Sequence, residues 1–136
     1  MTDKLPITVL IIDDDADDRF FMEQAFRADS PTARIHLADS GQQALDMLVL
    51  IHPIPDVILL DLNMPGLNGF DVLEQLKQHT AHQHIPVIVL TTSEAPADRE
   101  RAYYLEANGF LSKPTTQQGL SEIANRIRRD YARQVL

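Results

Sequence analysis

The 136-residue sequence contains no cysteine. Disulfide frameworks, thiolate metal sites and cysteine nucleophiles are therefore excluded, and a reducing compartment agrees with this absence. No apolar run approaches the roughly 20 residues that a membrane-spanning helix needs, and residues 1–6 lack the apolar stretch of a signal peptide. We therefore expect a soluble, cytoplasmic protein without a membrane partner.

Positive charge is also scarce, because 12 basic side chains face 20 acidic ones and the formal net charge is -8. A surface of this sign repels the phosphate backbone of nucleic acids, so nucleic-acid binding is not expected. The hydrophobic fraction of 44% is sufficient for a core, whereas 136 residues are too few for two ordinary domains. We expect one domain over residues 1–136 with no output domain.

Short apolar runs alternate with amphipathic segments along the whole chain. The runs are rich in Ile, Val and Leu, which is typical of parallel strands that are covered on both faces. We expect strands at residues 7–12, 35–38, 57–60, 86–90 and 109–111. Five strand–helix units predict an α/β fold of the flavodoxin-like, doubly wound (βα)5 type, a three-layer sandwich with the parallel strand order 2-1-3-4-5.

Helices are expected in the intervening segments, and capping residues mark where they begin. Ser40 and Asn68 are candidate N-caps of the second and third helices, and Thr92 or Ser93 of the fourth. The first helix is expected at residues 17–28 and the last at residues 116–133. Three phenylalanines at helical spacing in the first helix are expected to enter the core, with a partner surface as the alternative for one of them: Phe20, Phe21 and Phe26.

Polar residues follow the predicted strands at the points where these end. Asp13 and Asp14 come after the first strand, Asp61 after the third, Thr91 after the fourth and Lys113 after the fifth. In a parallel sheet these positions share one edge, and ligands bind there in the crevice where the strand order reverses. For the order 2-1-3-4-5 this crevice separates strands one and three, so the three carboxylates are expected to meet.

Grouped carboxylates need a counter-charge. Two like charges about 4 Å apart repel by about 4 kcal/mol at an effective dielectric constant of about 20, and protonation or a cation must relieve this repulsion. Mg²⁺ accepts one or two carboxylates and keeps positions for water and phosphate oxygens. A free oxygen of Asp61 could then attack a phosphoryl group, while Lys113 supplies a cation and Thr91 a hydroxyl donor.

Taken together, these strand-end residues resemble the receiver domains of two-component response regulators. The matching pieces are Asp13-Asp14, the run Leu59-Leu60-Asp61-Leu62-Asn63-Met64-Pro65-Gly66, Thr91 and Lys113-Pro114, within a resemblance that extends from Ile7 to Tyr131. The resemblance implies a phosphoacceptor switch rather than an enzyme, with Mg²⁺ or Mn²⁺ as cofactor. It implies these roles: Asp61 as phosphoacceptor and metal ligand, Asp14 as direct ligand, Asp13 as ligand through water, Asn63 as ligand through its backbone carbonyl, and Thr91 and Lys113 as phosphoryl-binding groups.

The resemblance also implies a switching element and partners. Phe110 stands where receivers carry an aromatic residue that moves with Thr91, although it lacks a hydroxyl, and the Lys113–Pro114 bond is expected to be cis. Phosphorylation is expected to alter the face formed by the fourth helix, fifth strand and fifth helix. The expected donor is a sensor histidine kinase or phosphotransfer protein, and residues 86–93 resemble the subgroup that serves bacterial phytochromes. The downstream protein is not identified, and both a monomer and a phosphorylation-favoured homodimer fit.

Other interpretations of these residues are open at this stage. A phosphatase with an aspartyl-phosphate intermediate would need a general acid two residues after the nucleophile, where this chain has Asn63. A flavin-binding module would need a phosphate cradle where this chain has aspartates. A receiver-like adaptor that works without phosphorylation is a further alternative. Finally, Asp15, Asp17 and Asp18 fit the ordinary role of acidic residues at a helix N-terminus.

Overall fold

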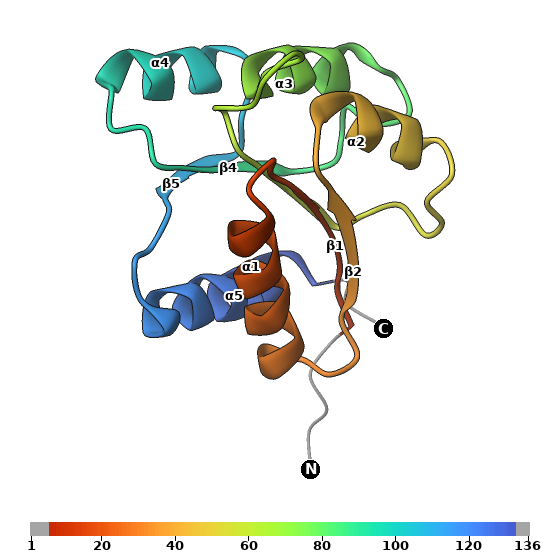
Figure 1. Cartoon of the computed structure of the whole chain (residues 1–136). Coiled ribbons are helices and arrows are strands. Elements are labelled where there is room, and N and C mark those ends of the chain that lie inside the picture. Colours follow the sequence, from red (N-terminus) through yellow and green to blue (C-terminus); the bar gives the residue numbers. More distant parts are fainter. Residues whose placement is uncertain (1–5, 133–136) are drawn as a thin grey trace.

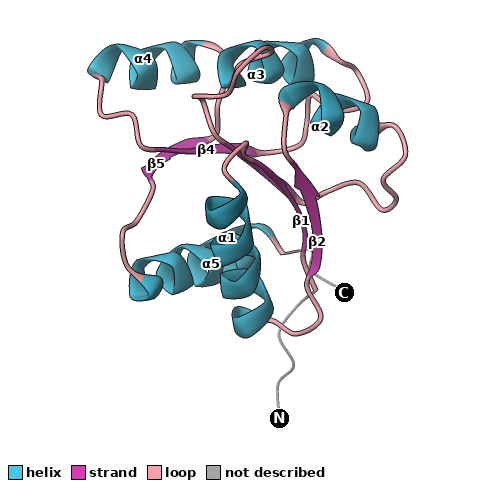
Figure 2. Cartoon of the chain, viewed as in Figure 1, coloured by secondary structure: helices cyan, strands magenta, loops and turns pink. Residues whose placement is uncertain are grey.

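The computed structural model describes residues 6–132, so the first five residues and Arg133, the expected end of the last helix, lie outside the described part. Strands and helices alternate throughout (Figures 1 and 2). The strands are β1 (Thr8–Ile12), β2 (Arg34–Ala38), β3 (Val57–Leu60), β4 (Val87–Thr91) and β5 (Gly109–Ser112). The helices are α1 (Ala16–Asp29), α2 (Gly41–Leu48), α3 (Gly69–Gln78), α4 (Pro96–Tyr104) and α5 (Gln117–Tyr131).

All five strands form one parallel sheet with the order β2-β1-β3-β4-β5. Helices α2, α3 and α4 cover one face of the sheet, and α1 and α5 cover the other (Figure 1). This is the flavodoxin-like, doubly wound arrangement that the sequence predicts, and the order places β1 beside β3. The two strands that carry the acidic residues are therefore neighbours.

Side-chain caps fix the starts of most helices. Ser40 accepts a hydrogen bond from the backbone of Gln43, and Asn68 forms a capping box with Asp71, as the sequence predicts. Helix α4 is different. Its N-cap is Ala95, which gives no side-chain hydrogen bond, and Ser93 instead donates to Asp98. The expected cap at Thr92 or Ser93 is therefore wrong, because the helix begins later, with Pro96 in its first turn.

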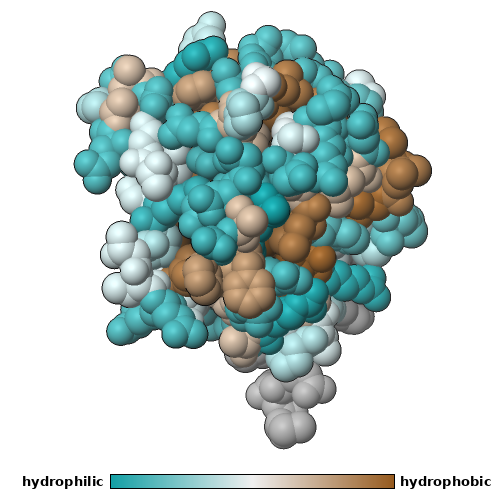
Figure 3. All heavy atoms as spheres, viewed as in Figure 1, coloured by the Kyte–Doolittle hydropathy of each residue, from teal (hydrophilic) through white to brown (hydrophobic). Residues whose placement is uncertain are grey.

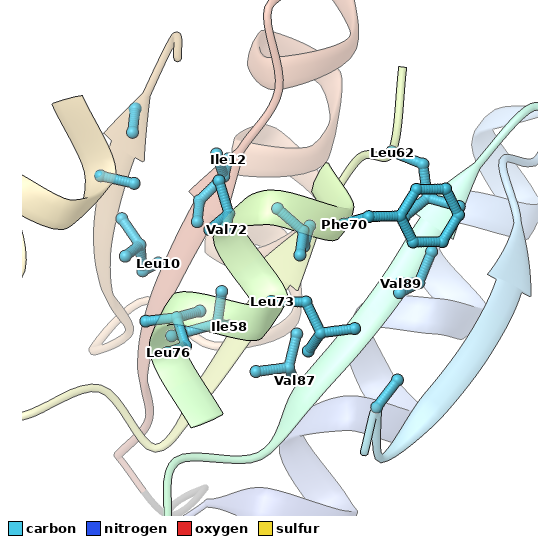
Figure 4. Packing of buried hydrophobic residues seen from close by; sticks show 14 of the residues in the cluster. Leu10, Ile12, Ile58, Leu62, Phe70, Val72, Leu73, Leu76, Val87 and Val89 are labelled. Carbon is cyan, nitrogen blue, oxygen red and sulfur yellow. The ribbon is translucent and has the colours of Figure 1, made fainter. Parts of the chain in front are cut away.

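The core consists of two clusters, one on each face of the sheet. In the first cluster, α3 supplies the apolar residues Val72, Leu73 and Leu76, and these side chains point toward the strands (Figure 4). The second cluster joins the other face of the sheet to α1 and α5 through Met22, Phe26, Ala124 and Ile127. The sheet is thus covered on both faces, as its near-continuous apolar strands indicate.

Two expectations about single residues are wrong. Phe26 is buried, but Phe20 and Phe21 are 53% and 54% exposed, and Phe21 lies at a hollow beside α1. Apolar side chains accordingly reach the surface over α1 (Figure 3). The Lys113–Pro114 bond is not cis; among the described residues the cis peptide bond is at His52–Pro53. Lys113 already reaches the acidic residues across a trans bond.

Helix α3 begins very close to the end of β3. A Cβ atom added to Gly69 would lie 2.3 Å from the carbonyl oxygen of Asp61 and 2.5 Å from the Cα atom of Leu62. Only glycine fits this approach, which holds the loop after Asp61 against the first turn of the helix. Within residues 6–132, no helix has both the length and the hydropathy needed to cross a bilayer.

Candidate functional site

Backbone hydrogen bonds place the acidic residues at one edge of the sheet. The N–H of Asp61 donates to the carbonyl of Ile12 over 3.0 Å, and the N–H of Asp13 donates to the carbonyl of Ala38 over 3.1 Å. Both aspartates therefore directly extend strands that are paired with each other. Their separation is set by the sheet and not by a mobile loop.

Asp13, Asp14 and Asp61 form a carboxylate cluster, in which one oxygen of each lies within 4.8 Å of those of the other two. Asp13 and Asp61 are buried, whereas Asp14 is exposed. Among the described residues this is the one group of three or more acidic, histidine or cysteine side chains with metal-binding geometry. The sequence prediction that these three side chains meet is thus matched by the structure.

Lys113 brings positive charge into the carboxylate cluster from the end of β5. Its Nζ atom lies 2.7 Å from Oδ2 of Asp13, 3.3 Å from Oδ2 of Asp61 and 2.8 Å from Oδ2 of Asp18. The Lys113 side chain is only 12% exposed, so these ion pairs are poorly screened by water. One ammonium group therefore neutralises part of a strongly acidic site.

The pKa values reflect this crowding. Burial is the largest influence on Asp13, and together with the nearby Asp61 it raises the pKa of the carboxyl group despite its bond to Lys113. Burial alone would lower the pKa of Lys113, but hydrogen bonds to Asp13 and Asp18 and attraction to Asp61 outweigh it, so that the pKa rises. Lys113 is consequently a permanent cation, and the carboxylate cluster lacks enough positive charge of its own.

The loop after β1 is fixed by further hydrogen bonds. Oδ1 of Asp13 accepts from the backbone N–H of Asp15 over 2.9 Å, and Nη1 of Arg19 donates to the Asp13 carbonyl over 2.6 Å. Asp15 itself caps α1 by accepting from the N–H of Asp18. The expected helix-capping role of an acidic residue is thus confirmed for Asp15.

Thr91, Phe110 and Asn63 are the remaining residues to which the family resemblance gives a role. Thr91 ends β4 and is fully buried, and its Oγ1 accepts from the N–H of Ser93 over 3.2 Å. Asn63 is exposed, and its backbone N–H donates to Oδ1 of Asp61 over 3.4 Å. Phe110 is half-buried on β5. The roles that the family resemblance implies for these three residues stay predictions.

Two arginines of α4 lie over three aromatic rings. The guanidinium carbon of Arg99 lies 5.7 Å from the ring centre of Phe110 and 5.5 Å from that of Tyr103. The guanidinium carbon of Arg101 lies 4.2 Å from the ring centre of Phe70. The only fully buried side chain of α4 is Ala102. Helix α4 thus combines one buried alanine with cation–π contacts at the surface.

A hollow of about 640 Å³ opens beside the carboxylate cluster, between α1 and the start of α5. Asp13, Asp18, Asp61 and Lys113 line its polar end, and its remaining wall includes apolar residues such as Leu120. Asp61 is only 5% exposed and is one of the residues that line this hollow.

The donor atoms of the carboxylate cluster suit a hard divalent cation. All three side chains offer carboxylate oxygens, and the nearby Lys113 leaves a net negative charge. Mg²⁺ and Mn²⁺ prefer oxygen ligands of this kind. The cluster therefore fits a divalent metal, with Asp13, Asp14 and Asp61 as the side chains that would hold it.

The ion pair of Asp18 with Lys113 was not predicted. Acidic residues in the first turn of a helix ordinarily interact with the helix dipole, and Asp18 does lie in the first turn of α1. The two residues are 95 positions apart in the chain, and no spacing rule in the sequence connects them. Only the folded arrangement of α1 against β5 reveals the pair.

The amino-acid sequence of the chain is similar to those of known proteins. Residues 9–125 match the model of the response regulator receiver domain. The chain is 34% identical over 127 residues to the "Probable methanogenesis regulatory protein FilR2" of Methanothrix harundinacea, covering 90% of this chain and 82% of that protein. It is 38% identical over 116 residues to a "Probable cyclic di-GMP phosphodiesterase" of Vibrio cholerae, covering 85% of this chain but only 25% of that protein.

Two solved structures are similar over nearly their full length. The Mn²⁺-bound form of response regulator Rcp1 has a TM-score of 0.81 and 28% identity, with 96% of this chain and 98% of that chain covered. The phosphorylated cyanobacterial phytochrome response regulator RcpA has a TM-score of 0.84 and 26% identity, with 92% and 93% covered. One of these proteins binds a divalent metal and the other carries a phosphoryl group.

Proposed function

The chain belongs to the response regulator receiver domain family, and on this premise we propose that it accepts a phosphoryl group on Asp61. The observation that carries the proposal is the position of this carboxylate. Asp61 is buried at the end of β3, within 4.8 Å of oxygens of Asp13 and Asp14 and 3.3 Å from Nζ of Lys113. A nucleophile, a metal-binding pair and a cation thus lie together.

The reaction begins with attack of an Asp61 oxygen on the phosphorus of a phosphohistidine. The new O–P bond forms as the P–N bond breaks, and the imidazole nitrogen keeps the electron pair and takes a proton from solvent. Hydrolysis later resets the site, when water attacks the phosphorus, inorganic phosphate leaves and the Asp61 carboxylate returns. The protein contributes mainly position and charge, as is usual in phosphoryl transfer.

Mg²⁺ is the metal that we propose, with Mn²⁺ as a substitute. When bound, it supplies positive charge that screens the phosphoryl oxygens from the carboxylates. Asp13 and Asp14 would hold it together with Asp61, and we propose the backbone carbonyl of Asn63 as a further ligand. The Mn²⁺-bound Rcp1 supports a divalent ion in this family.

Lys113 and Thr91 are the groups that we propose to bind the phosphoryl oxygens. Lys113 already lies beside Asp61, and an ammonium forms strong, charge-assisted hydrogen bonds with phosphate. The hydroxyl oxygen of Thr91 now accepts a hydrogen bond from the N–H of Ser93. On phosphorylation the Thr91 side chain would give up this bond and donate to a phosphoryl oxygen on Asp61. Phe110 would follow and alter the surface formed by α4, β5 and α5.

The proposed phosphodonor is a histidine kinase or a phosphotransfer protein in the cytoplasm. Likeness to RcpA, a phytochrome response regulator, supports a bacterial phytochrome as one candidate kinase. Because the chain spans only 25% of the Vibrio cholerae relative, that protein's phosphodiesterase name carries no activity to this chain. The phosphatase alternative is not favoured, because Asn63 cannot act as a general acid two residues after Asp61.

Labelling with a small phosphodonor tests the assignment of Asp61. Wild-type protein with acetyl phosphate and Mg²⁺ should gain one phosphoryl group, detected by intact-mass spectrometry. The Asp61→Asn variant should gain none, because the amide lacks a nucleophilic oxygen of comparable strength.

A matched control is Asp56→Asn, which changes the same chemical group at the opposite end of β3, where the carboxylate accepts from the N–H of Thr8. This variant should be labelled as the wild type is. Full labelling of Asp61→Asn would refute the proposal.

A further inference from the structure

Three carboxylates share Lys113. Its Nζ atom lies 2.7 Å from Asp13, 2.8 Å from Asp18 and 3.3 Å from Asp61, and it donates hydrogen bonds to Asp18 and Asp61. An ammonium group has only three hydrogens. The oxygens of a phosphoryl group on Asp61 must therefore share these hydrogens with Asp13 and Asp18, unless one of the two moves away.

Asp18 is the partner that can leave most easily. Asp13 and Asp61 belong to the carboxylate cluster and are buried, whereas Asp18 lies outside the cluster and its side chain is 44% exposed. Water can solvate its carboxylate as soon as the ion pair opens, so that the exchange costs little free energy. Asp13 and the phosphoryl group would then keep Lys113 in place.

Asp18 also opposes a phosphoryl group by its charge. Its Oδ2 and that of Asp61 contact the same nitrogen, so they are no farther apart than the sum of the two contact distances. Added negative charge on Asp61 is repelled at this range, because both groups lie in a partly desolvated site. The Asp18 carboxylate thus competes for Lys113 and also repels the phosphoryl group on Asp61.

We infer that Asp18 is a positioning residue that competes with the phosphoryl group for Lys113 and thereby limits how strongly the site holds that group. The inference rests on the proposed function of Asp61. Through Asp18, helix α1 would influence how strongly the site holds the phosphoryl group, although no residue of α1 belongs to the carboxylate cluster.

Beryllofluoride, which mimics a phosphoryl group on a carboxylate, is the probe for the test. With Mg²⁺ present, Asp18→Asn should bind beryllofluoride about two- to fivefold more tightly than wild type, the range expected for one partly exposed ion pair. Fluorine NMR or calorimetry measures this affinity. Labelling by acetyl phosphate should also be faster in Asp18→Asn than in the wild type.

Asp17→Asn is the matched control, because it removes the same charge from the same turn of α1. Asp17 is exposed and, within residues 6–132, takes part in no ion pair with Lys113. Its affinity should stay near that of the wild type. Asp18→Glu can still reach Lys113 and should resemble the wild type more than Asp18→Asn does.

A second background separates competition from a general structural effect. In Lys113→Ala protein, Asp18→Asn should no longer raise the affinity, because the contested ammonium is gone. A gain that persists without Lys113, an unchanged affinity in Asp18→Asn, or a weaker one would overturn the inference while wild-type labelling on Asp61 stands. Absent labelling of the wild type would instead defeat the proposed function, and this inference with it.

Discussion

At the scale of single residues, the site depends on carboxylates that have too little positive charge among them. Two of the three, Asp13 and Asp61, are buried, and the pKa of Asp13 is raised by this burial. A buried carboxylate that shares one lysine with two others gains from a further cation beside it. The shortage of charge is therefore the physical basis of metal binding here.

The raised pKa of Asp13 predicts a pH dependence for Mg²⁺ binding. The metal needs the ionised carboxylate, so its affinity is complete above the raised pKa and is lost as pH falls through it, earlier than for an aspartate at the ordinary value of 3.8. Below that pKa each pH unit should weaken binding by up to about tenfold. Calorimetric titration at a series of pH values checks this.

Asp13→Asn provides the comparison for this titration. It should bind Mg²⁺ more weakly near neutral pH but lose less of its affinity in acid, because the titrating group has been removed. An equal pH dependence in both proteins would show that another group controls the binding.

The sequence predicts these residues well where chain topology alone brings them together. Asp13 and Asp61 directly follow paired strands, so their meeting follows from the strand order. Asp18, Phe20 and Phe21 were interpreted less well, because their environments depend on how α1 is turned against the sheet. Periodicity shows that a helix has an apolar side, but it does not resolve which of several adjacent phenylalanines faces inward.

At the scale of elements, the close approach of α3 to β3 positions the loop that follows Asp61. Gly69→Ala should destabilise the protein by about 2–3 kcal/mol, because the new Cβ would meet backbone atoms of Asp61 and Leu62, which cannot rotate away. Urea unfolding measures this loss. A cost below about 0.5 kcal/mol would mean that the helix start shifts freely.

Gly66 gives a contrasting substitution in the same loop. Its φ of +71° is strained for other residues, but a Cβ there would meet no atom within 4 Å. Gly66→Ala should therefore cost only about 1 kcal/mol, from backbone strain alone.

Helices α1 and α5 are joined by a buried ion pair. Asp29 accepts from Nε of Arg128 over 2.6 Å and from Nδ2 of Asn125 over 2.9 Å, and the side chains of the ion pair are 6% and 13% exposed. Arg128→Ala should cost about 3 kcal/mol, because a buried carboxylate loses its cation. Thermal unfolding with a urea series checks this value.

The exposed pair of Arg126 and Asp130 on α5 is the control for that experiment. Its atoms are 3.8 Å apart and its side chains are 67% and 55% exposed. Arg126→Ala should change stability by less than about 0.5 kcal/mol, because water screens the pair. Equal losses in both variants would argue that helix propensity, and not burial, governs this helix.

Element bounds were predicted to within one or two residues, since strands and helices alternate with clear changes of period. The start of α4 is the exception. Thr92 and Ser93 are typical caps, but Ser93 is engaged with Asp98 and the chain extends further before Pro96 begins the helix. A local side-chain hydrogen bond thus replaces the expected cap there.

At the scale of the whole molecule, metal binding is coupled to folding. The three proposed ligands come from the ends of two strands that pair only in the folded sheet, so Mg²⁺ is expected to bind the native state in preference to the unfolded chain. At about 100 times its dissociation constant, Mg²⁺ should add about 2.7 kcal/mol to the free energy of unfolding. The rise of the unfolding midpoint with Mg²⁺ concentration measures this linkage.

NaCl at equal ionic strength is the control, because a chain with a net charge of -8 is stabilised to some extent by any salt. Asp14→Ala should lose most of the response that is specific to Mg²⁺, since it removes one of the three carboxylates whose oxygens lie within 4.8 Å of one another. A response retained in full by this variant would contradict its role as a ligand.

The loose attachment of α4 has a mechanical consequence. This helix begins without a side-chain cap, buries only Ala102 completely and rests on aromatic rings through Arg99 and Arg101. Guanidinium groups can slide over a ring face without opening a void, whereas interlocked aliphatic side chains resist such movement. The paired strands therefore hold the carboxylate oxygens at fixed positions, whereas α4 can be displaced with little loss of packing.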